Sequence, residues 1–150
     1  MIKMPRVMVL YYSRTGNTEK MAKAIAEGLR NVQGIDIELK YHATPEELAN
    51  TDAIIIGMPT YYHDITNDMK KLLEEIAAKG INLKGKIGAS FGSYGWSGEA
   101  PGLILEIMEN KLDMKVLKPP LLIKKTPDEK GLEKCRKLGK NVAEQVSKSS

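Results

Sequence analysis

A six-residue turn rich in hydroxyl and small side chains separates the first apolar run of the chain from a segment with helical spacing. Its residues are Ser13, Arg14, Thr15, Gly16, Asn17 and Thr18. A helix that begins after such a turn directs several backbone N–H groups and the positive end of its dipole at one place, and hydroxyl donors add to them. The turn therefore predicts a phosphate-binding site. An ordinary helix N-cap is the alternative, because Ser, Asn and Thr are common there.

Several classes of phosphate-binding protein are excluded by residues that this turn lacks. Nucleoside triphosphatase loops end in Gly-Lys-Ser/Thr, and dinucleotide folds need three spaced glycines, whereas Gly16 stands alone and is followed by Asn-Thr. A low-molecular-weight tyrosine phosphatase would carry its cysteine here. The one cysteine, Cys135, falls in the last helical segment, where we expect a half-buried packing thiol. A receiver domain would have an aspartate where Ile56-Gly57 ends the third strand.

Two further segments gather most of the aromatic side chains of a chain that has few. Five of the eight Phe, Trp and Tyr residues occur in them, namely Tyr61, Tyr62, Phe91, Tyr94 and Trp96. Exposed rings are unfavourable unless they cover something flat and apolar, and glycines let the backbone approach a ligand closely. The binding residues predicted here are Pro59, Thr60, Tyr61, Tyr62, Ser93, Tyr94, Gly95, Trp96 and Gly98. The alternative is that the rings close the end of the sheet as core.

Short apolar runs alternate with helical segments along the chain. The runs cover residues 7–12, 53–57, 87–91 and 121–123. Val116 and Leu117 precede the last run, and Pro119-Pro120 interrupts this strand region. In residues 35–41, apolar and charged side chains alternate, as in a strand near a sheet edge. Helical spacing appears over residues 21–29, 69–76, 103–112 and 132–146. This alternation predicts a three-layer α/β fold, a parallel sheet with helices on both faces.

The carboxyl ends of parallel strands meet at one edge of the sheet, where open α/β sheets bind their ligands. The turn at residues 13–18 and the aromatic loops after the third and fourth strands all fall there. A phosphate site beside two aromatic loops describes a phosphorylated planar heterocycle lying across this edge.

The composition indicates a soluble globular protein of one domain, residues 1–150. The chain is 42% hydrophobic and 28% charged, which is too apolar for a disordered protein. No stretch approaches the roughly 18 apolar residues of a membrane span. A single cysteine excludes internal disulfides and multi-cysteine metal sites, so we expect a reducing compartment, the cytoplasm.

The net charge of +4 is unevenly distributed. Residues 1–75 carry 9 basic and 11 acidic side chains, whereas residues 76–150 carry 14 and 8. The C-terminal basic residues include Lys124, Lys125, Lys130, Lys134, Arg136, Lys137 and Lys140. They are either a solvated helix face or a surface for an acidic partner. Nucleic-acid binding is not expected, because the run lacks interleaved aromatic residues and any recognisable module.

Over almost its whole length the chain resembles flavodoxin-type FMN proteins. Residues 13–18 are similar to that family's phosphate loop around Thr-Gly-Asn-Thr, and residues 58–61 and 89–98 most resemble the flavodoxin domain of flavodiiron proteins. The resemblance implies FMN as cofactor and a five-stranded sheet in the order 2-1-3-4-5. It also implies that residues 13–18 hold the phosphate, residues 59–62 border the isoalloxazine, and residues 93–96 close its other side.

The implied function is electron transfer between redox partners, for which ferredoxin-like, rubredoxin-like and flavodiiron-type proteins are candidates. No catalytic residue is expected, because the flavin does the electron chemistry itself. The alternatives are an FMN-dependent NAD(P)H or quinone reductase on the same fold, and a flavin-free regulatory module. Flavodoxins are typically acidic, whereas this chain has a pI of about 9.0, so we expect a less negative potential for the reduced flavin.

Overall fold

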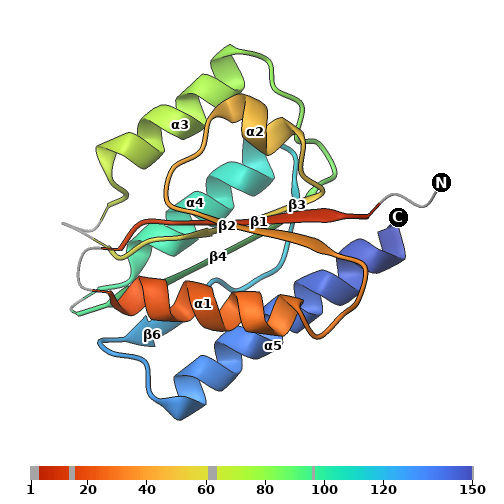
Figure 1. Cartoon of the computed structure of the whole chain (residues 1–150). Helices are drawn as coiled ribbons and strands as arrows, with labels where there is room; N and C mark the ends of the chain where they lie inside the picture. Colours follow the sequence, from red (N-terminus) through yellow and green to blue (C-terminus); the bar gives the residue numbers. More distant parts are fainter. Residues whose placement is uncertain (1–3, 14–15, 61–63, 96, 150) are drawn as a thin grey trace.

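A parallel sheet between two layers of helices makes up the fold (Figure 1). The computed structural model describes residues 4–13, 16–60, 64–95 and 97–149. The strands are β1 (Arg6–Tyr11), β2 (Asp36–Lys40), β3 (Ala53–Gly57), β4 (Ile87–Tyr94), β5 (Lys115–Val116) and β6 (Leu121–Lys124). The helices are α1 (Asn17–Leu29), α2 (Pro45–Ala49), α3 (Asn67–Ala78), α4 (Glu99–Asn110) and α5 (Glu129–Ser149). The order β2-β1-β3-β4-β5, with every pair parallel, confirms the predicted fold.

The predicted fifth strand is present as two pieces. β5 pairs with the first residues of β4 and β6 with its last four, from Phe91 to Tyr94. Pro119 and Pro120 lie between the pieces, where a proline cannot donate to a ladder. Because β6 supplies a partner beyond Phe91, β4 continues to Tyr94. The strand predicted over residues 87–91 is therefore three residues too short.

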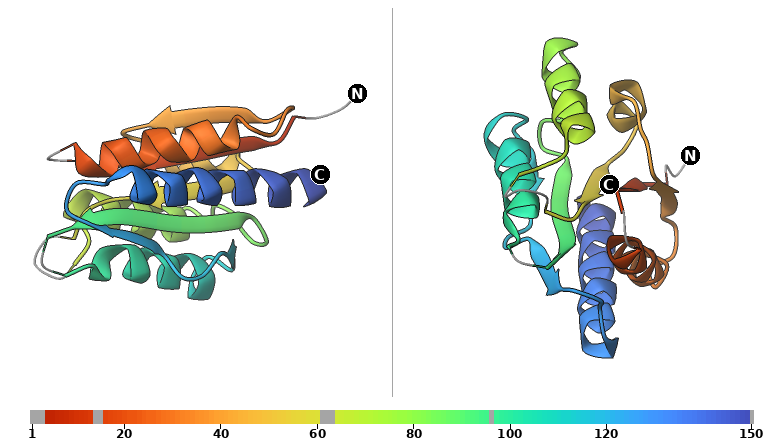
Figure 2. Two further views of the ribbon diagram at one scale, coloured as in Figure 1. Left: turned by 90° about the horizontal axis from the view of Figure 1, so that it is seen from below. Right: turned by 90° about the vertical axis from the view of Figure 1, so that its left-hand side faces the viewer.

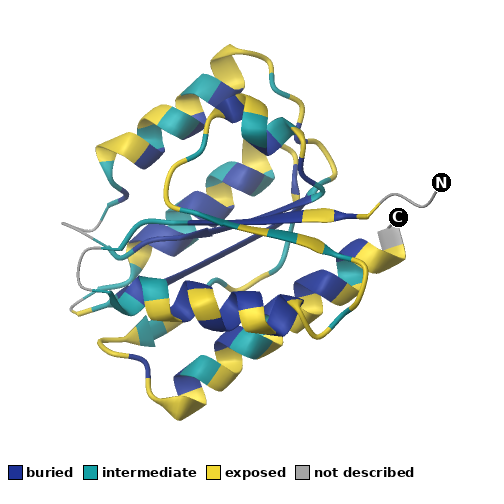
Figure 3. Ribbon diagram, in the orientation of Figure 1, coloured by how far each residue is buried: buried dark blue, intermediate teal, exposed yellow. Residues whose placement is uncertain are grey.

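The two faces of the sheet bury separate cores. Along β1, Val7 and Val9 pack with α1 and α5, whereas Met8 and Leu10 pack with α3 and α4. Figure 1 shows α1 and α5 on one side of the sheet and α2, α3 and α4 on the other. β3 is buried at every position, and β1 and β4 are buried except at terminal residues, as Figure 3 shows. Burial on both faces explains why β3 is apolar throughout.

Strand β2 lies at the edge, as its alternating pattern predicts. Asp36 and Glu38 are exposed, while Ile37 and Leu39 are half-buried against the helices. The short helix α2 after it was not predicted. Thr44 and Glu47 form its capping box. Five residues are too few for an apolar period to be visible.

Cys135 lies in the layer formed by α1 and α5 and is fully buried, more than the predicted half-buried position. Burial raises the pKa of its thiol to about 12, so the side chain behaves as a small apolar group. No helix among the described residues is long and apolar enough to cross a membrane.

Candidate functional site

The loops after β1, β3 and β4 lie together at the carboxyl-terminal edge of the sheet. The registers Tyr11–Gly57 and Gly57–Phe91 bring the last residues of these strands side by side. The right-hand view of Figure 2 looks onto the molecule from the side where α1, α3 and α4 begin. The structure thus brings together the segments from which the sequence predicted one site.

The Ser13 side chain organises the turn after β1. Its Oγ accepts hydrogen bonds from the backbone N–H of Gly16 at 3.1 Å and of Glu19 at 3.2 Å. Gly16 is the N-cap of α1 with a φ of 91°, a left-handed conformation that is strained for a residue with a Cβ. The hydroxyl oxygen of Ser13 is taken up by these two amides, so its own proton is the group that this side chain has to offer a ligand.

The first turn of α1 carries the donor set that a phosphate requires. The internal ladder begins with the Lys20 N–H on the Gly16 carbonyl at 3.1 Å. Glu19 already donates to Ser13, so the amides of Asn17 and Thr18 are those to which the helix itself gives no i−4 partner. Two amides, the Ser13 hydroxyl and the helix dipole fit a phosphate dianion in chemistry and charge.

A buried hydrogen-bonded pair joins the first turn of α1 to the end of β4. The hydroxyl oxygens of Thr18 and Ser93 lie 3.1 Å apart, and the Ser93 N–H donates to Thr18 Oγ1 at 3.4 Å. Both residues are buried. The two hydroxyls contact each other, so they fix the distance between the start of α1 and the end of β4.

The loop after β3 is tied to β4 and α4. The Met58 N–H donates to the Phe91 carbonyl at 3.1 Å, and a Cβ at Gly92 would lie 2.0 Å from the Met58 oxygen. Thr60 Oγ1 accepts a hydrogen bond at 2.9 Å from the backbone N–H of Ala100, in the first turn of α4. Thr60, predicted to border a ligand, therefore also caps this helix.

The third loop starts from the end of β4 and is held by β6. Tyr94 accepts a hydrogen bond on its carbonyl from the Lys125 N–H at 2.6 Å, and a Cβ at Gly98 would lie 3.4 Å from the Tyr94 ring. Tyr94 and Gly98 are half-buried and Gly95 is exposed. Phe91, by contrast, is fully buried under Gly57. Its assignment to the exposed aromatic set is wrong, and for this ring the core alternative holds.

Tyr41 is a site residue that the sequence did not reveal. Its hydroxyl donates to the Ser13 carbonyl at 3.2 Å, and its ring meets those of Tyr11 and Tyr12 at centroid distances of 5.6 and 5.7 Å. Tyr41 is 42% exposed, unusual for so large an apolar ring. Tyr11 donates to Glu19 at 3.4 Å; burial, and then the Glu19 carboxylate, raise the pKa of this phenol. Two tyrosines thus support the turn from outside.

The sequence matches the flavodoxin family over residues 9–139. The chain belongs to this family. The flavodoxin of Clostridium beijerinckii is 33% identical over 141 residues, which is 90% of this chain and 97% of that protein. A solved flavodoxin from the domain Archaea has a TM-score of 0.86 and 41% identity, covering 95% of this chain and 99% of the other.

Flavodiiron proteins are similar to this flavodoxin-family chain over a part of their length. A flavo-diiron protein of Clostridium acetobutylicum is 33% identical over 148 residues, which is 93% of this chain but 36% of that protein. The expected membership of the flavodoxin family is therefore confirmed, and flavodiiron proteins are similar as well, but true flavodoxins match this chain at least as closely as they do. Of these three proteins, the archaeal flavodoxin has the highest identity.

Several predicted site residues of this flavodoxin-family chain lie outside the described residues. They are Arg14, Thr15, Tyr61, Tyr62 and Trp96. Among the described neighbours, Asp64 forms an ion pair with Lys70 at 2.6 Å. The hydrogen bonds from this ammonium and from the Ile65 N–H lower the pKa of the Asp64 carboxyl. Asp64 is thus a carboxylate partly balanced by a neighbouring lysine.

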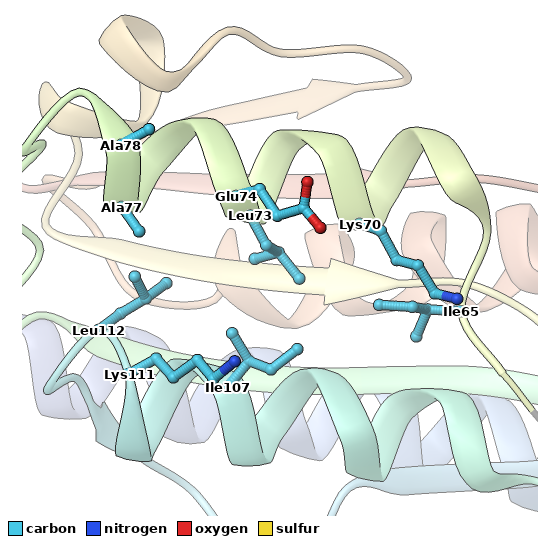
Figure 4. A pocket seen from close by; sticks show the side chains of 9 residues that line it. All are labelled: Ile65, Lys70, Leu73, Glu74, Ala77, Ala78, Ile107, Lys111 and Leu112. Atoms are coloured by element: carbon cyan, nitrogen blue, oxygen red, sulfur yellow. The ribbon is translucent and has the colours of Figure 1, made fainter.

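A second concave region lies between α3 and α4, as Figure 4 shows. This groove has a volume of about 500 Å³, and its lining residues are Ile65, Lys70, Leu73, Glu74, Ala77, Ala78, Ile107, Lys111 and Leu112. It runs along the helices, and none of the predicted binding residues lines it. We therefore do not include it in the candidate site.

Proposed function

We propose that this chain binds FMN at the carboxyl-terminal edge of its sheet and carries electrons between redox proteins. FMN binding and electron transfer are properties of the flavodoxin family, to which the chain belongs. The observation that carries the proposal is a set of hydrogen bonds at one edge of the sheet. The Thr18–Ser93 pair links the start of α1 to the end of β4, and the Thr60–Ala100 hydrogen bond links the loop after β3 to the start of α4.

The phosphate would be held at the turn after β1. The Asn17 and Thr18 amides and the Ser13 hydroxyl supply donors, and Gly16 provides the left-handed turn that starts the helix. Arg14 and Thr15 complete this predicted set. The adjacent Tyr41 and Tyr11 would hold the turn in place without contacting the phosphate themselves.

The isoalloxazine would lie between the second and third loops. Pro59 and Thr60 would border it from β3, and Tyr94, Gly95 and Gly98 from β4 and the start of α4. Tyr61, Tyr62 and Trp96 remain predicted contacts. When bound, FMN supplies the electron transfer through its ring system. The role of the protein is to orient that ring and exclude water from it.

The partners are redox proteins. Relatives of this chain are named rubredoxin-oxygen oxidoreductase and flavo-diiron protein. This chain covers 35% and 36% of those proteins, so they are about three times longer. We infer a ferredoxin-like or rubredoxin-like protein, or a flavodiiron-type protein supplied as a separate chain, as the partner. A cytoplasmic location follows as a proposal from the single reduced cysteine.

The proposal is tested by the absorbance spectrum of the purified protein and by titration of flavin-free protein with FMN and with riboflavin. We expect flavin bands and much tighter binding of FMN, because riboflavin lacks the phosphate. Ser13→Ala removes one hydroxyl donor and loosens two amides. It should lower FMN affinity by roughly tenfold to a hundredfold, the range of a charge-assisted hydrogen bond, and leave riboflavin affinity unchanged.

Two outcomes would contradict the proposal. A colourless protein with no heat stabilisation by FMN would indicate a flavin-free module. Rapid NAD(P)H oxidation with quinones would indicate a reductase instead of a carrier. Thr44→Ala removes the N-cap of α2, which lies on the sheet face that α3 and α4 cover. It serves as a control and should leave FMN affinity unchanged.

A further inference from the structure

A basic surface runs from the end of β6 along one flank of α5. We call it the β6–α5 surface; its residues are Lys124, Lys125, Lys130, Lys134 and Lys137. All five side chains are exposed. Within the described part of the chain none of them takes part in an ion pair. The surface therefore presents five exposed lysines without an ion-pair partner among the described residues.

The acidic side chains of the same segment are engaged elsewhere. Asp128 Oδ1 accepts a hydrogen bond from the Gly131 N–H at 2.8 Å, at the start of α5. Glu129 and Glu133 both form ion pairs with Arg136, the second at 3.0 Å. Residues 124–137 carry six basic and three acidic side chains, so the β6–α5 surface keeps a net positive charge.

The spacing on α5 places the lysines on the flank that faces away from α1. Arg136 contacts Glu27 of α1 at 3.5 Å, which defines the opposite flank. Lys130, Lys134 and Lys137 follow one another at four and three residues and so share one side of the helix. In the right-hand view of Figure 2, α5 lies between α1 and β6, so this side adjoins β6.

The β6–α5 surface adjoins the candidate site through β6. Lys124 is the register partner of Tyr94, and the Lys125 N–H donates to the Tyr94 carbonyl at 2.6 Å. Leu122 is 39% exposed, and its Cδ1 lies 3.3 Å from the position of a Cβ at Gly98. An exposed apolar side chain and two lysines therefore border the third loop.

We propose that the β6–α5 surface docks a small electron-transfer protein whose own surface is acidic, a statement that rests on the proposed function. Positive charge steers a negative partner to this edge, and Leu122 supplies an apolar contact beside it. A partner docked there lies next to the loop proposed to enclose the flavin. The exposed leucine favours a protein over a nucleic acid, whose contacts are mainly made by cations to phosphates.

The test uses reduced acidic ferredoxin as electron donor to the FMN-loaded protein in an anaerobic stopped-flow instrument. The variant Lys124→Glu/Lys125→Glu is compared with Lys84→Glu/Lys115→Glu, which changes the net charge equally at the amino-terminal edge. We expect the bimolecular rate of wild type to fall at least about tenfold from low to high salt. The β6 variant should be at least about tenfold slower at low salt with a flattened salt dependence, and the control should remain within about threefold of wild type.

Equal effects of the two variants, or a rate independent of salt, would overturn the inference. The proposed function would be unaffected as long as the wild-type protein binds FMN. A wild-type protein that does not bind FMN would instead contradict the proposed function. Amide NMR shifts on adding oxidised ferredoxin to flavin-free protein test the surface independently, and they should centre on Lys124 and Lys125. A fluorescent single-stranded oligonucleotide that binds these lysines more tightly than ferredoxin does would also contradict the inference.

Discussion

The two helical layers pack in different ways. α1 and α5 approach so closely that a Cβ at Gly28 would lie 2.0 Å from the Arg136 carbonyl oxygen, and one at Gly139 2.0 Å from that of Ile25. α3 and α4 instead leave the groove of about 500 Å³ between them (Figure 4). The first layer is joined by backbone contact, and the second by side chains that leave space.

This difference extends to how each layer positions the candidate site. The start of α1 is fixed by the packing of the whole helix against α5. The start of α4 is fixed by hydrogen bonds with other segments. Thr60 Oγ1 accepts one from the Ala100 N–H, and Ser90 Oγ donates one to the Pro101 carbonyl at 2.7 Å. We infer that the packing of α1 on α5, together with the Thr18–Ser93 hydrogen bonds, positions the phosphate end of the site, whereas polar contacts position the ring end.

The largest expected contrast is in thiol reactivity. Cys135 is fully buried between α1 and α5, and its raised pKa of about 12 leaves almost no thiolate at pH 8. Ala77→Cys places a thiol in the exposed wall of the groove. In the native state, Ellman's reagent should react with no thiol in wild type and with one thiol in the variant. After denaturation it should react with one thiol in wild type and with two in the variant. Rapid labelling of native wild type would show that the α1–α5 layer opens readily.

The second prediction introduces the same methyl group into each layer. Gly139→Ala forces a Cβ against a backbone carbonyl that cannot move alone, so it should cost about 3 kcal/mol of unfolding free energy. Gly102→Ala in α4 has nothing within 4 Å of its Cβ and should stabilise the protein by about 0.5–1 kcal/mol through helix propensity. Urea unfolding measures both. If the two changes were of equal sign and size, the contrast between the layers would be lost.

The third prediction concerns the polar contact at α4. Thr60→Val leaves the buried Ala100 N–H without its partner and should cost about 1 kcal/mol, together with a severalfold loss of FMN affinity. Thr66→Val is the matched control, because Thr66 caps α3 within its own segment through the Met69 N–H at 3.4 Å. It should lower stability by no more than Thr60→Val does and leave FMN affinity unchanged. Loss of affinity in the control would mean that the ring end depends on the whole layer.

Local patterns predicted much of the fold. β3 is apolar throughout because helices cover both of its faces, and β2 alternates because one of its faces is wet, so the local hydrophobic pattern distinguished the two strands. The end of β4 was missed because Gly92 and Ser93 are poor strand residues, and their pairing comes from β6, far along the chain. α2 was missed because its local marks, the capping box of Thr44 and Glu47 and the proline at its first position, belong to a helix start that no apolar period follows.

The candidate site was predicted in outline but not in its internal contacts. The turn at residues 13–18 was visible because its residue types and its place before a helix are local features. The Thr18–Ser93 pair spans 75 residues of sequence, and the contact of Tyr41 with Ser13 spans 28, so neither has a local pattern. A tyrosine directly after an edge strand becomes informative only when the sheet places it beside β1.

Tyr41→Phe gives the smallest expected effect and is the sharpest test of the contrast at the phosphate end. The change removes the hydrogen bond to the Ser13 carbonyl and retains the ring contacts with Tyr11 and Tyr12. FMN affinity should fall about twofold, the lower end of the range of one neutral hydrogen bond, because the side chain is partly exposed. Riboflavin affinity should stay constant, because the phosphate turn alone is loosened. Flavin-free stability should change by less than about 0.5 kcal/mol, since the side chain is 42% exposed. A loss of FMN affinity greater than that of Thr60→Val would mean that polar contacts, and not the packing of α1 on α5, position the phosphate end as well.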